Sequence, residues 1–186
     1  MTGVQTCALP ISAALDAREI DLAIGILQSQ HKSVRQETLF AENYVAVSSK
    51  EWRPAQTRVR SQLSLRQLES AKFVIAAPSA TFQGGVEKLL FEHQLSAQIV
   101  LRSRHLGAIP ELISQTDLLT IVPRMYAQTL ASRFDFRIWE LPISSFKYTV
   151  NLLWHHSTDH DAAHQWIRQQ IRSLFAVRSS ILARRP

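Results

Sequence analysis

Short apolar runs alternate along this chain with segments of helical period, and the alternation predicts β and α elements in turn. Continuous or alternating apolar runs are typical of strands, whereas apolar positions three and four apart mark one face of a helix. The predicted strands span residues 20–26, 39–48, 72–77, 98–104, 118–122, 136–141 and 148–155. The predicted helices span residues 64–68, 83–93, 108–115, 124–131 and 162–175. This order favours an α/β fold with mainly parallel sheets covered by helices.

Individual residues predict where these helices begin. Ser64 fits the N-cap of the first helix and Asp161 fits the N-cap of the last, because their side-chain oxygens can accept hydrogen bonds from free backbone N–H groups. Pro123 fits the first position of the helix over 124–131, where its missing N–H costs nothing. In the last helix we expect Trp166 and Ile167 to pack inward and the next residue, an arginine, to face solvent.

The composition is that of a globular chain with a core. A length of 186 residues suits one ordinary domain or two small lobes, and 46% of the residues are hydrophobic. No apolar run approaches the roughly 20 residues that cross a bilayer. The first basic residue is Arg18, so the start of the chain lacks the positively charged region with which a secretory signal peptide begins. The single cysteine, Cys7, cannot form an internal disulfide. We therefore expect a cytoplasmic protein that does not enter a membrane.

The chain is basic, with 21 Lys and Arg against 15 Asp and Glu and a net charge of +6. Such a balance can indicate an anionic partner. The arginines fall in a polar stretch over residues 53–66 and along residues 168–185, and neither set interleaves with aromatics as a nucleic-acid surface would. This spread favours a solvated surface over contact with a DNA groove.

Three segments, in this order, resemble the effector-binding domain of LysR-type transcriptional regulators, and most closely the branch that responds to aromatic compounds. They are Glu-Ile-Asp-Leu-Ala-Ile-Gly at 19–25, Thr-Asp-Leu-Leu-Thr-Ile-Val-Pro at 116–123 and Asp-His-Asp-Ala-Ala-His-Gln-Trp-Ile-Arg at 159–168. The resemblance runs from about Ala13 to Phe175. It implies a two-lobed α/β fold like that of type 2 periplasmic solute-binding proteins. Residues 13–47 and 149–178 would form the first lobe, residues 48–148 the second, and residues 179–186 a basic tail.

The same resemblance implies that the first lobe is incomplete. The family normally begins with a winged helix-turn-helix domain, a linker helix, and then a strand and helix of the first lobe, and none of these has a counterpart before Ala13. Contact with DNA is therefore expected only through the N-terminal domain of a full-length protein. The resemblance also implies that the full-length protein forms homo-oligomers. Residues 1–12 match nothing in the family, and our hypothesis is that they are a non-native segment.

One cluster of histidines and aspartates could be mistaken for a metal or enzyme site. It comprises His155, His156, Asp159, His160, Asp161 and His164. His156, His160 and His164 would share one face of a continuous helix. The helix is expected to begin only after Asp161, which removes the first two from that face, so we favour a structural role and expect no bound metal. The sequence also lacks a Gly-x-Ser-x-Gly motif, a cysteine with a partner and a Gly-rich phosphate loop, so neither catalysis nor a cofactor is expected.

Ligand binding has a better physical basis. In open α/β lobes, ligands bind beyond the carboxyl ends of strands, where helix N-termini offer amide donors. The resemblance implies that three such junctions face one another across a cleft between the lobes, where a small aromatic acid or phenol would bind. His105 lies where the aromatic-responsive branch often has a histidine. The candidate residues are Gly25, Ile26 and Leu27 in the first lobe and Ser79, Thr81, Phe82, Gln83, Arg104 and His105 in the second.

Each candidate also has a structural explanation. Ser79 and Thr81 are typical turn and cap residues, Gln83 fits a solvated first turn, and a core position suits Phe82 equally well. His105 is consistent with a histidine that satisfies a nearby carbonyl. A glycine such as Gly25 is often required where the backbone adopts a positive φ.

The sequence therefore leads to one main functional hypothesis and two alternatives. The main hypothesis is the effector-sensing part of a LysR-type regulator, in which the effector shifts the relative population of two lobe arrangements. The first alternative is an exported solute-binding protein of a transport system, which shares the fold. The second is a metal-dependent enzyme that uses the cluster of histidines and aspartates.

Overall fold

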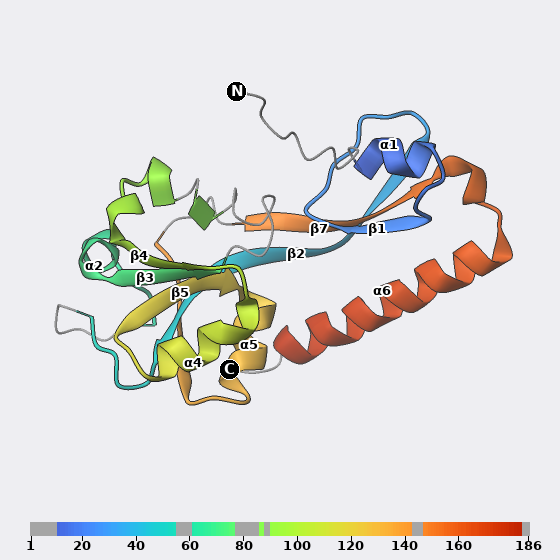
Figure 1. The fold of residues 1–186 in the computed structure, drawn as a ribbon. Helices are drawn as coiled ribbons and strands as arrows, with labels where there is room; N and C mark the ends of the chain where they lie inside the picture. The colour runs from blue at the N-terminus through green and yellow to red at the C-terminus, as the bar shows by residue number, and fades with distance from the viewer. Residues whose placement is uncertain (1–10, 55–60, 77–85, 88–89, 143–146, 184–186) are drawn as a thin grey trace, which may run out of the picture. The chain divides into compact units, whose positions relative to one another are not determined.

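A computed structural model of the chain describes residues 11–54, 61–76, 86–87, 90–142 and 147–183 (Figure 1). The chain forms two compact units. Unit 1 contains residues 1–41 and 148–186, and unit 2 contains residues 42–147. The chain therefore passes between the units twice, after Ala41 and after Lys147.

Unit 1 is a small sheet with helices packed on it. Strand β1 (Leu22–Gly25) pairs antiparallel with β7 (Lys147–His155), and β7 lies beside β2 (Val34–Ser49). Helix α1 (Ile11–Asp16) precedes β1, while the 3-10 turn η4 (His156–Thr158) and helix α6 (Ala162–Ala183) follow β7. The apolar core of the unit is a cluster formed by Leu15, Ala23, Val34 and Leu153.

Unit 2 has a sheet of mixed direction. Strand β3 (Lys72–Ala76) lies between β4 (Ile99–Ser103) and β5 (Leu118–Pro123) and is parallel to both. Strand β2 pairs antiparallel with β5 and with β6 (Phe136–Trp139). Its helical segments include α2 (Leu65–Ser70), η1 (Ser96–Gln98), η2 (Leu106–Ala108), α4 (Ile109–Ser114) and α5 (Arg124–Ala131). Residues 86–87 and 90–92 are also helical and lie within the predicted helix over 83–93. The core combines α4, α5 and the strands, with Val45, Val47, Val74, Ile109, Ile113, Val122, Ala127, Leu130 and Phe136 buried together.

The structure confirms the α/β class and corrects the expected strand directions. The parallel pairs are those of β3, whereas β1–β7, β2–β5 and β2–β6 are antiparallel. An apolar run is equally compatible with either direction, because burial depends on the faces of a strand and not on the orientation of its neighbour.

Strand β2 also differs from its prediction in length and in the unit that it serves. It begins at Val34, five positions before the predicted start at Leu39. Residues 44–47 pair with β5 and residues 46–49 pair with β6, so residues 42–47 belong to unit 2, although the resemblance implied the first lobe. Pairing with two unit 2 strands is the physical reason for this difference.

The helix starts are partly as predicted. Ser64 caps α2 in a capping box in which its hydroxyl accepts from the Gln67 N–H and the Gln67 side chain accepts from the Ser64 N–H. Asp161 caps α6, since its carboxylate accepts from the His164 N–H at 2.8 Å. Pro123 is the residue before α5 and not its first helical position, because its ψ of 139° is extended.

The predicted orientation of α6 is wrong. Trp166 is 62% exposed and Ile167 is 36% exposed, whereas Arg168 is only 4% exposed. Asp161 sets the start of the helix, and at about 100° per residue Trp166 and Arg168 must point in nearly opposite directions. Carbonyl groups of η4 and the ring of Trp154 hold the arginine inward. The helix also continues to Ala183, through part of the predicted tail.

In the part of the chain that the structure describes, no helix is both long enough and apolar enough to cross a membrane.

Candidate functional site

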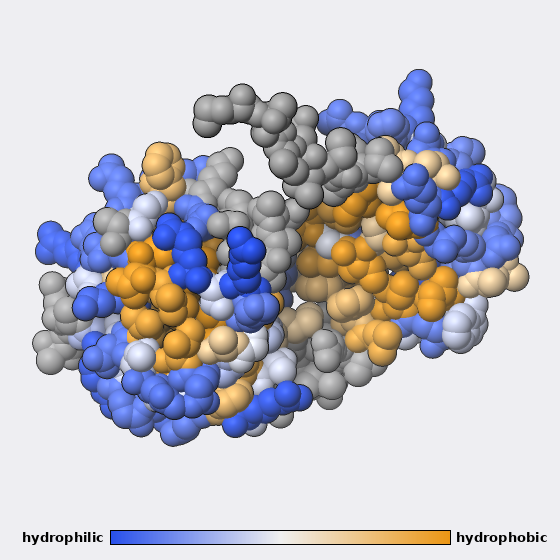
Figure 2. Space-filling view, in the orientation of Figure 1, coloured by the Kyte–Doolittle hydropathy of each residue, from blue (hydrophilic) through white to orange (hydrophobic). Residues whose placement is uncertain are grey.

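The candidate residues of unit 1 follow the end of β1. Gly25 lies opposite Asn151 of β7, and Leu27 packs partly buried against the unit 1 core. Buried Asn151 fixes this junction, because its amide donates to the Leu27 carbonyl at 2.7 Å and accepts from the Thr38 hydroxyl at 2.9 Å. Ile26 is 47% exposed, and Figure 2 shows hydrophobic residues gathered on the visible face of unit 1. The junction therefore presents apolar surface from a rigidly held turn.

A positive φ is not the reason for Gly25. No described glycine has a positive φ, and a Cβ at this position would meet the Leu27 side chain at 3.4 Å, which is close to ordinary contact. The structural explanation that we considered for this glycine is therefore wrong.

The described candidates of unit 2 follow the end of β4. Arg104 is exposed in a bend, and exposed His105 precedes η2. The Ser103 hydroxyl holds the backbone of this bend, because it accepts from the His105 N–H and donates to the His105 carbonyl, both at 3.1 Å. The His105 ring makes no hydrogen bond with any residue that the structure describes. The hydroxyl of Ser103 thus fixes the backbone, while the residue is exposed and its ring bonds to no carbonyl of a described residue.

The remaining candidates, Ser79, Thr81, Phe82 and Gln83, lie outside the described residues. The structure therefore brings together two local groups, Gly25 to Leu27 within unit 1 and Arg104 with His105 within unit 2. Their convergence on one effector remains a prediction.

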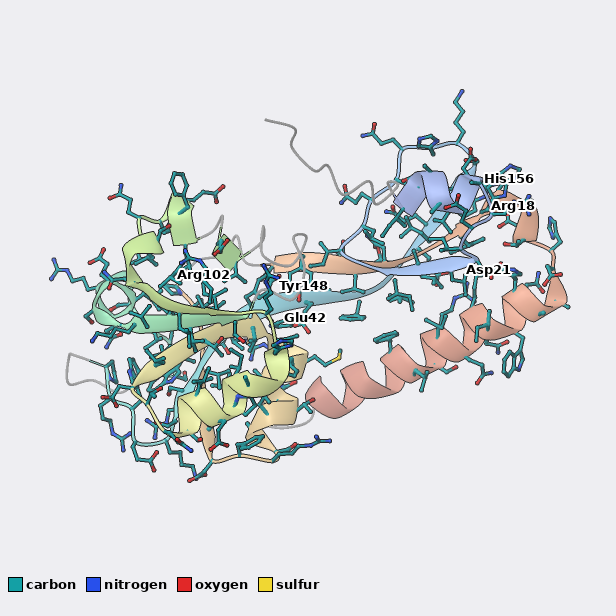
Figure 3. The ribbon with its side chains drawn as sticks, in the orientation of Figure 1. Arg18, Asp21, Glu42, Arg102, Tyr148 and His156 are labelled. Carbon is teal, nitrogen blue, oxygen red and sulfur yellow. The ribbon has the colours of Figure 1, made fainter. Side chains whose placement is uncertain are left out.

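A third strand–helix junction, between β5 and α5, was missed by sequence reasoning. Buried Glu42, labelled in Figure 3, accepts from the Asn43 N–H at 2.8 Å and from the Met125 N–H in the first turn of α5 at 3.1 Å. Arg124 donates to the Asn43 side chain at 2.9 Å and forms an ion pair with Glu140. A carboxylate of the chain itself thus supplies the negative charge that a helix N-terminus favours. The sequence did contain one signal of this junction. Pro123, the residue before α5, has a side chain that cannot cap the helix, so another group must do so.

Several members of the cluster of histidines and aspartates make contacts within unit 1. The side chain of His155 accepts from the Ser157 N–H and so caps η4, and its ring lies 4.6 Å from that of His156. His156 and His160 precede α6, as predicted from the cap at Asp161. In the described residues no group of three or more His, Cys, Asp or Glu side chains is placed to hold a metal ion.

Asp159 joins η4, β2 and β7. Its carboxylate accepts from the Trp154 indole N–H at 2.7 Å and from Arg35 at 3.1 Å. The hydrogen bond from Trp154, followed by that from Arg35, lowers the pKa of Asp159, because both stabilise the charged form. Asp16 lies 3.6 Å from His155, and a hydrogen bond from Ser33 lowers the pKa of Asp16. The contacts of Asp159 connect the end of η4 to β2 and β7.

Comparison with known proteins decides the family. Residues 9–176 match the model of the LysR substrate binding domain. The match includes residues 9–12, so the expectation that residues 1–12 match nothing in the family is wrong for these four. The chain belongs to the LysR substrate-binding domain family. This family consists of transcriptional regulators, and the match favours a regulator over a transport solute-binding protein.

Two curated relatives agree with this assignment to the LysR family. The chain is 27% identical to the HTH-type transcriptional activator NagR of Ralstonia sp over 87% of its length, covering 52% of that protein. It is 26% identical to the HTH-type transcriptional activator NahR of Pseudomonas putida over 92% of its length, covering 56% of that protein. The LysR-type domain described here therefore spans about half the length of these relatives.

The fold of this LysR domain is also known from solved structures. The regulatory domain of MexT, a transcriptional activator in Pseudomonas aeruginosa, superposes with a TM-score of 0.69 at 18% identity. The similarity covers 89% of this chain and 77% of the MexT domain. This likeness confirms the predicted α/β architecture of LysR regulatory domains.

Proposed function

We propose that this chain is the effector-sensing part of a cytoplasmic LysR-type regulator and that its effector is a small aromatic acid or phenol. The observation that carries the proposal is the match to the LysR substrate binding domain over residues 9–176. The names of two relatives describe helix-turn-helix transcriptional activators, which supports DNA contact through a separate N-terminal domain of a full-length protein. The chain itself is not an enzyme under this proposal.

The proposed effector site uses two kinds of surface. The turn at Gly25, Ile26 and Leu27 offers apolar contact, while Arg104 and His105 offer a cation and an imidazole that suit a carboxylate or a phenolic hydroxyl. Ser79, Thr81, Phe82 and Gln83 complete the proposed set as hydrogen-bond donors and an aromatic wall. The exposed, unpaired ring of His105 supports its assignment, since a ligand could bond to it without breaking a contact with a described residue.

The test is the binding of benzoate, salicylate and phenol by calorimetry to the intact chain and to two matched histidine variants. We expect His105→Ala to weaken binding of the preferred compound by about fivefold or more, which is what a lost neutral hydrogen bond of about 1 kcal/mol produces. His160→Ala, which removes an exposed histidine from unit 1, should leave binding unchanged.

Identical affinities for His105→Ala and the unaltered chain would refute the assignment of His105 to the site. If none of the three compounds bound, the aromatic effector class would be refuted, while the family assignment, which rests on the sequence match, would stand.

A further inference from the structure

The ring of His155 makes a different contact at each of its two nitrogens. Its Nδ1 atom accepts from the backbone N–H of Ser157 at 3.3 Å and so caps the 3-10 turn η4. Its Nε2 atom lies 3.6 Å from a carboxylate oxygen of Asp16 in α1. The His155 side chain is only 12% exposed, so both contacts are largely shielded from water. This one ring therefore links α1 to η4.

The contact at Nδ1 determines where the proton of the ring lies. A backbone N–H can only donate, so the Nδ1 atom that accepts from Ser157 carries no proton. The neutral ring then has its proton on Nε2, beside the Asp16 carboxylate. A charged imidazole carries a proton on both nitrogens and can accept from no donor. Protonation of His155 is therefore incompatible with the cap of η4, whereas it strengthens the attraction to Asp16.

We propose that His155 is a proton-dependent switch, which caps η4 while its ring is neutral and releases that cap to pair with Asp16 when the ring is charged. Histidine is the side chain that ordinarily changes its charge between about pH 5 and 8. The charged ring also has an alternative partner at Nδ1. The Ser157 hydroxyl oxygen lies 2.8 Å from this nitrogen and can accept its new proton.

The Asp16 carboxylate stays charged over this range of pH. A hydrogen bond from Ser33 lowers the pKa of Asp16, and the charges of His155, His31 and His156 lower it as well. His31, in the segment before β2, and His156, in η4, are thus the other titratable groups that act on this carboxylate. The rings of His155 and His156 are 4.6 Å apart, so a charge on one disfavours a charge on the other.

The other charged groups of the elements around His155 have partners of their own. Arg35 of β2 pairs with Asp159 at the end of η4, and His164 of α6 lies 3.7 Å from Asp21. The switch therefore involves Asp16 and the three histidines that act on it, and it lies wholly within unit 1. It does not depend on the identity of the effector.

The cap of η4 matters for α6, because the end of this turn supplies acceptors to the helix. The carbonyls of Thr158 and Asp159 accept from the buried Arg168 guanidinium. Protonation of His155 releases the Ser157 N–H at the start of the turn, while the Thr158 hydroxyl still donates to the His155 carbonyl. We therefore expect η4 to loosen at acid pH without losing its place beneath α6.

Nuclear magnetic resonance of the intact chain between about pH 7.5 and 5.5 tests the proposal. Long-range ¹H–¹⁵N spectra should show the His155 proton on Nε2 at the upper pH and on both ring nitrogens at the lower pH. The protection of the Ser157 amide against exchange with water should fall by about three- to tenfold over the same range, as expected for one lost hydrogen bond. Protection is measured relative to an unprotected amide at the same pH.

Three variants identify the group that is responsible. In His155→Asn the side chain can still cap η4 but does not titrate, so the protection of Ser157 should be the same at both pH values. His156→Asn is the matched control, because it removes the adjacent histidine and should retain the loss of protection. In Asp16→Asn the charged ring loses its partner, so the loss of protection should occur at a lower pH.

Two results would overturn the switch in the unaltered chain itself. One is a neutral His155 ring with its proton on Nδ1, which could not accept from Ser157. The other is a ring that stays neutral at the lower pH. An equal loss of Ser157 protection in His155→Asn and in the unaltered chain would also overturn the proposal, because another group would then be responsible.

Discussion

Replacing Arg168 by alanine should destabilise unit 1 far more than replacing Arg172, although both arginines lie on α6 one turn apart. The Arg168 guanidinium donates to the carbonyls of Thr158 at 3.2 Å and Asp159 at 3.1 Å, and it lies 4.8 Å from the centre of the Trp154 ring. Arg168 is only 4% exposed, so water cannot replace these contacts unless the structure opens locally.

The magnitude follows from these contacts. Hydrogen bonds from a charged donor contribute about 1.5–3 kcal/mol each, and a desolvated cation over an aromatic ring about 2 kcal/mol. Removing the buried cation also recovers its desolvation penalty, which is several kcal/mol. We therefore expect Arg168→Ala to lower the free energy of unfolding by about 2–3 kcal/mol. The free energy of unfolding of Arg168→Lys should lie between those of the unaltered chain and Arg168→Ala. An ammonium group keeps the charge but lacks the planar guanidinium geometry that reaches both carbonyls.

Arg172 provides the internal comparison. It is bonded to Glu37 through two of its nitrogens, but both side chains are more than a third exposed, and exposed ion pairs contribute about 0.2–1 kcal/mol. Urea unfolding followed by far-UV circular dichroism measures both variants, and hydrogen exchange shows whether the loss lies in η4 and β7. Equal destabilisation by Arg168→Ala and Arg172→Ala would refute the argument that burial makes the difference.

Two further predictions concern α6 and its partners. Asp161→Ala removes the carboxylate that accepts from the His164 N–H and should cost about 1 kcal/mol in urea unfolding, whereas Asp161→Asn, which keeps a cap oxygen, should cost little. The hydrogen bond and charge of Arg172 lower the pKa of Glu37 below its usual 4.5, so its contribution to stability is complete above about pH 4.5 and is lost as the pH falls below that value. Glu37→Gln should therefore be less stable than the unaltered chain at pH 7 and equally stable at low pH, and a difference that persists in acid would contradict this account.

The sequence predicts most of the element positions, because a buried element requires a run or a period of apolar residues within its own segment. The apolar runs identified β3, β5 and β7 to within one or two residues of each end. The caps at Ser64 and Asp161 could also be recognised, since a capping side chain bonds only to residues in its own first turn. Strand direction left no such mark, and the antiparallel pairs of β2 could not be foreseen from an apolar run.

The orientation of α6 could not be derived from composition for a different physical reason. Apolar residues occur on both sides of the helix, with Phe175 stacked on Phe40 at 5.0 Å and Trp166 exposed on the other side. The deciding contacts of Arg168 are with carbonyl groups of η4, and no side-chain pattern in the sequence identifies a backbone acceptor. An arginine is exposed in most helices, and this one is buried because its partners are held next to it by the turn at η4.

In the candidate site, too, features set by neighbouring residues could be predicted, whereas contacts between residues far apart in the sequence could not. The junctions after β1 and β4 were predictable because the carboxyl end of a strand can be located from the strand itself. The junction at α5 was missed because its cap, Glu42, is more than eighty positions away from Met125 in the sequence.

Hydrogen bonds hold β2 on both sides of the point where the chain passes from unit 1 to unit 2. The chain passes from unit 1 to unit 2 directly before Glu42. The Glu42 carboxylate accepts a hydrogen bond from the Met125 N–H in the first turn of α5. On the other side of the crossing, Thr38 is bonded to Asn151, which also holds the Leu27 carbonyl next to the proposed effector contacts. Only residues 39–41 separate these two anchored points. The crossing therefore lies within the continuous strand β2, with a hydrogen-bonded residue on each side of it, and not in a loop.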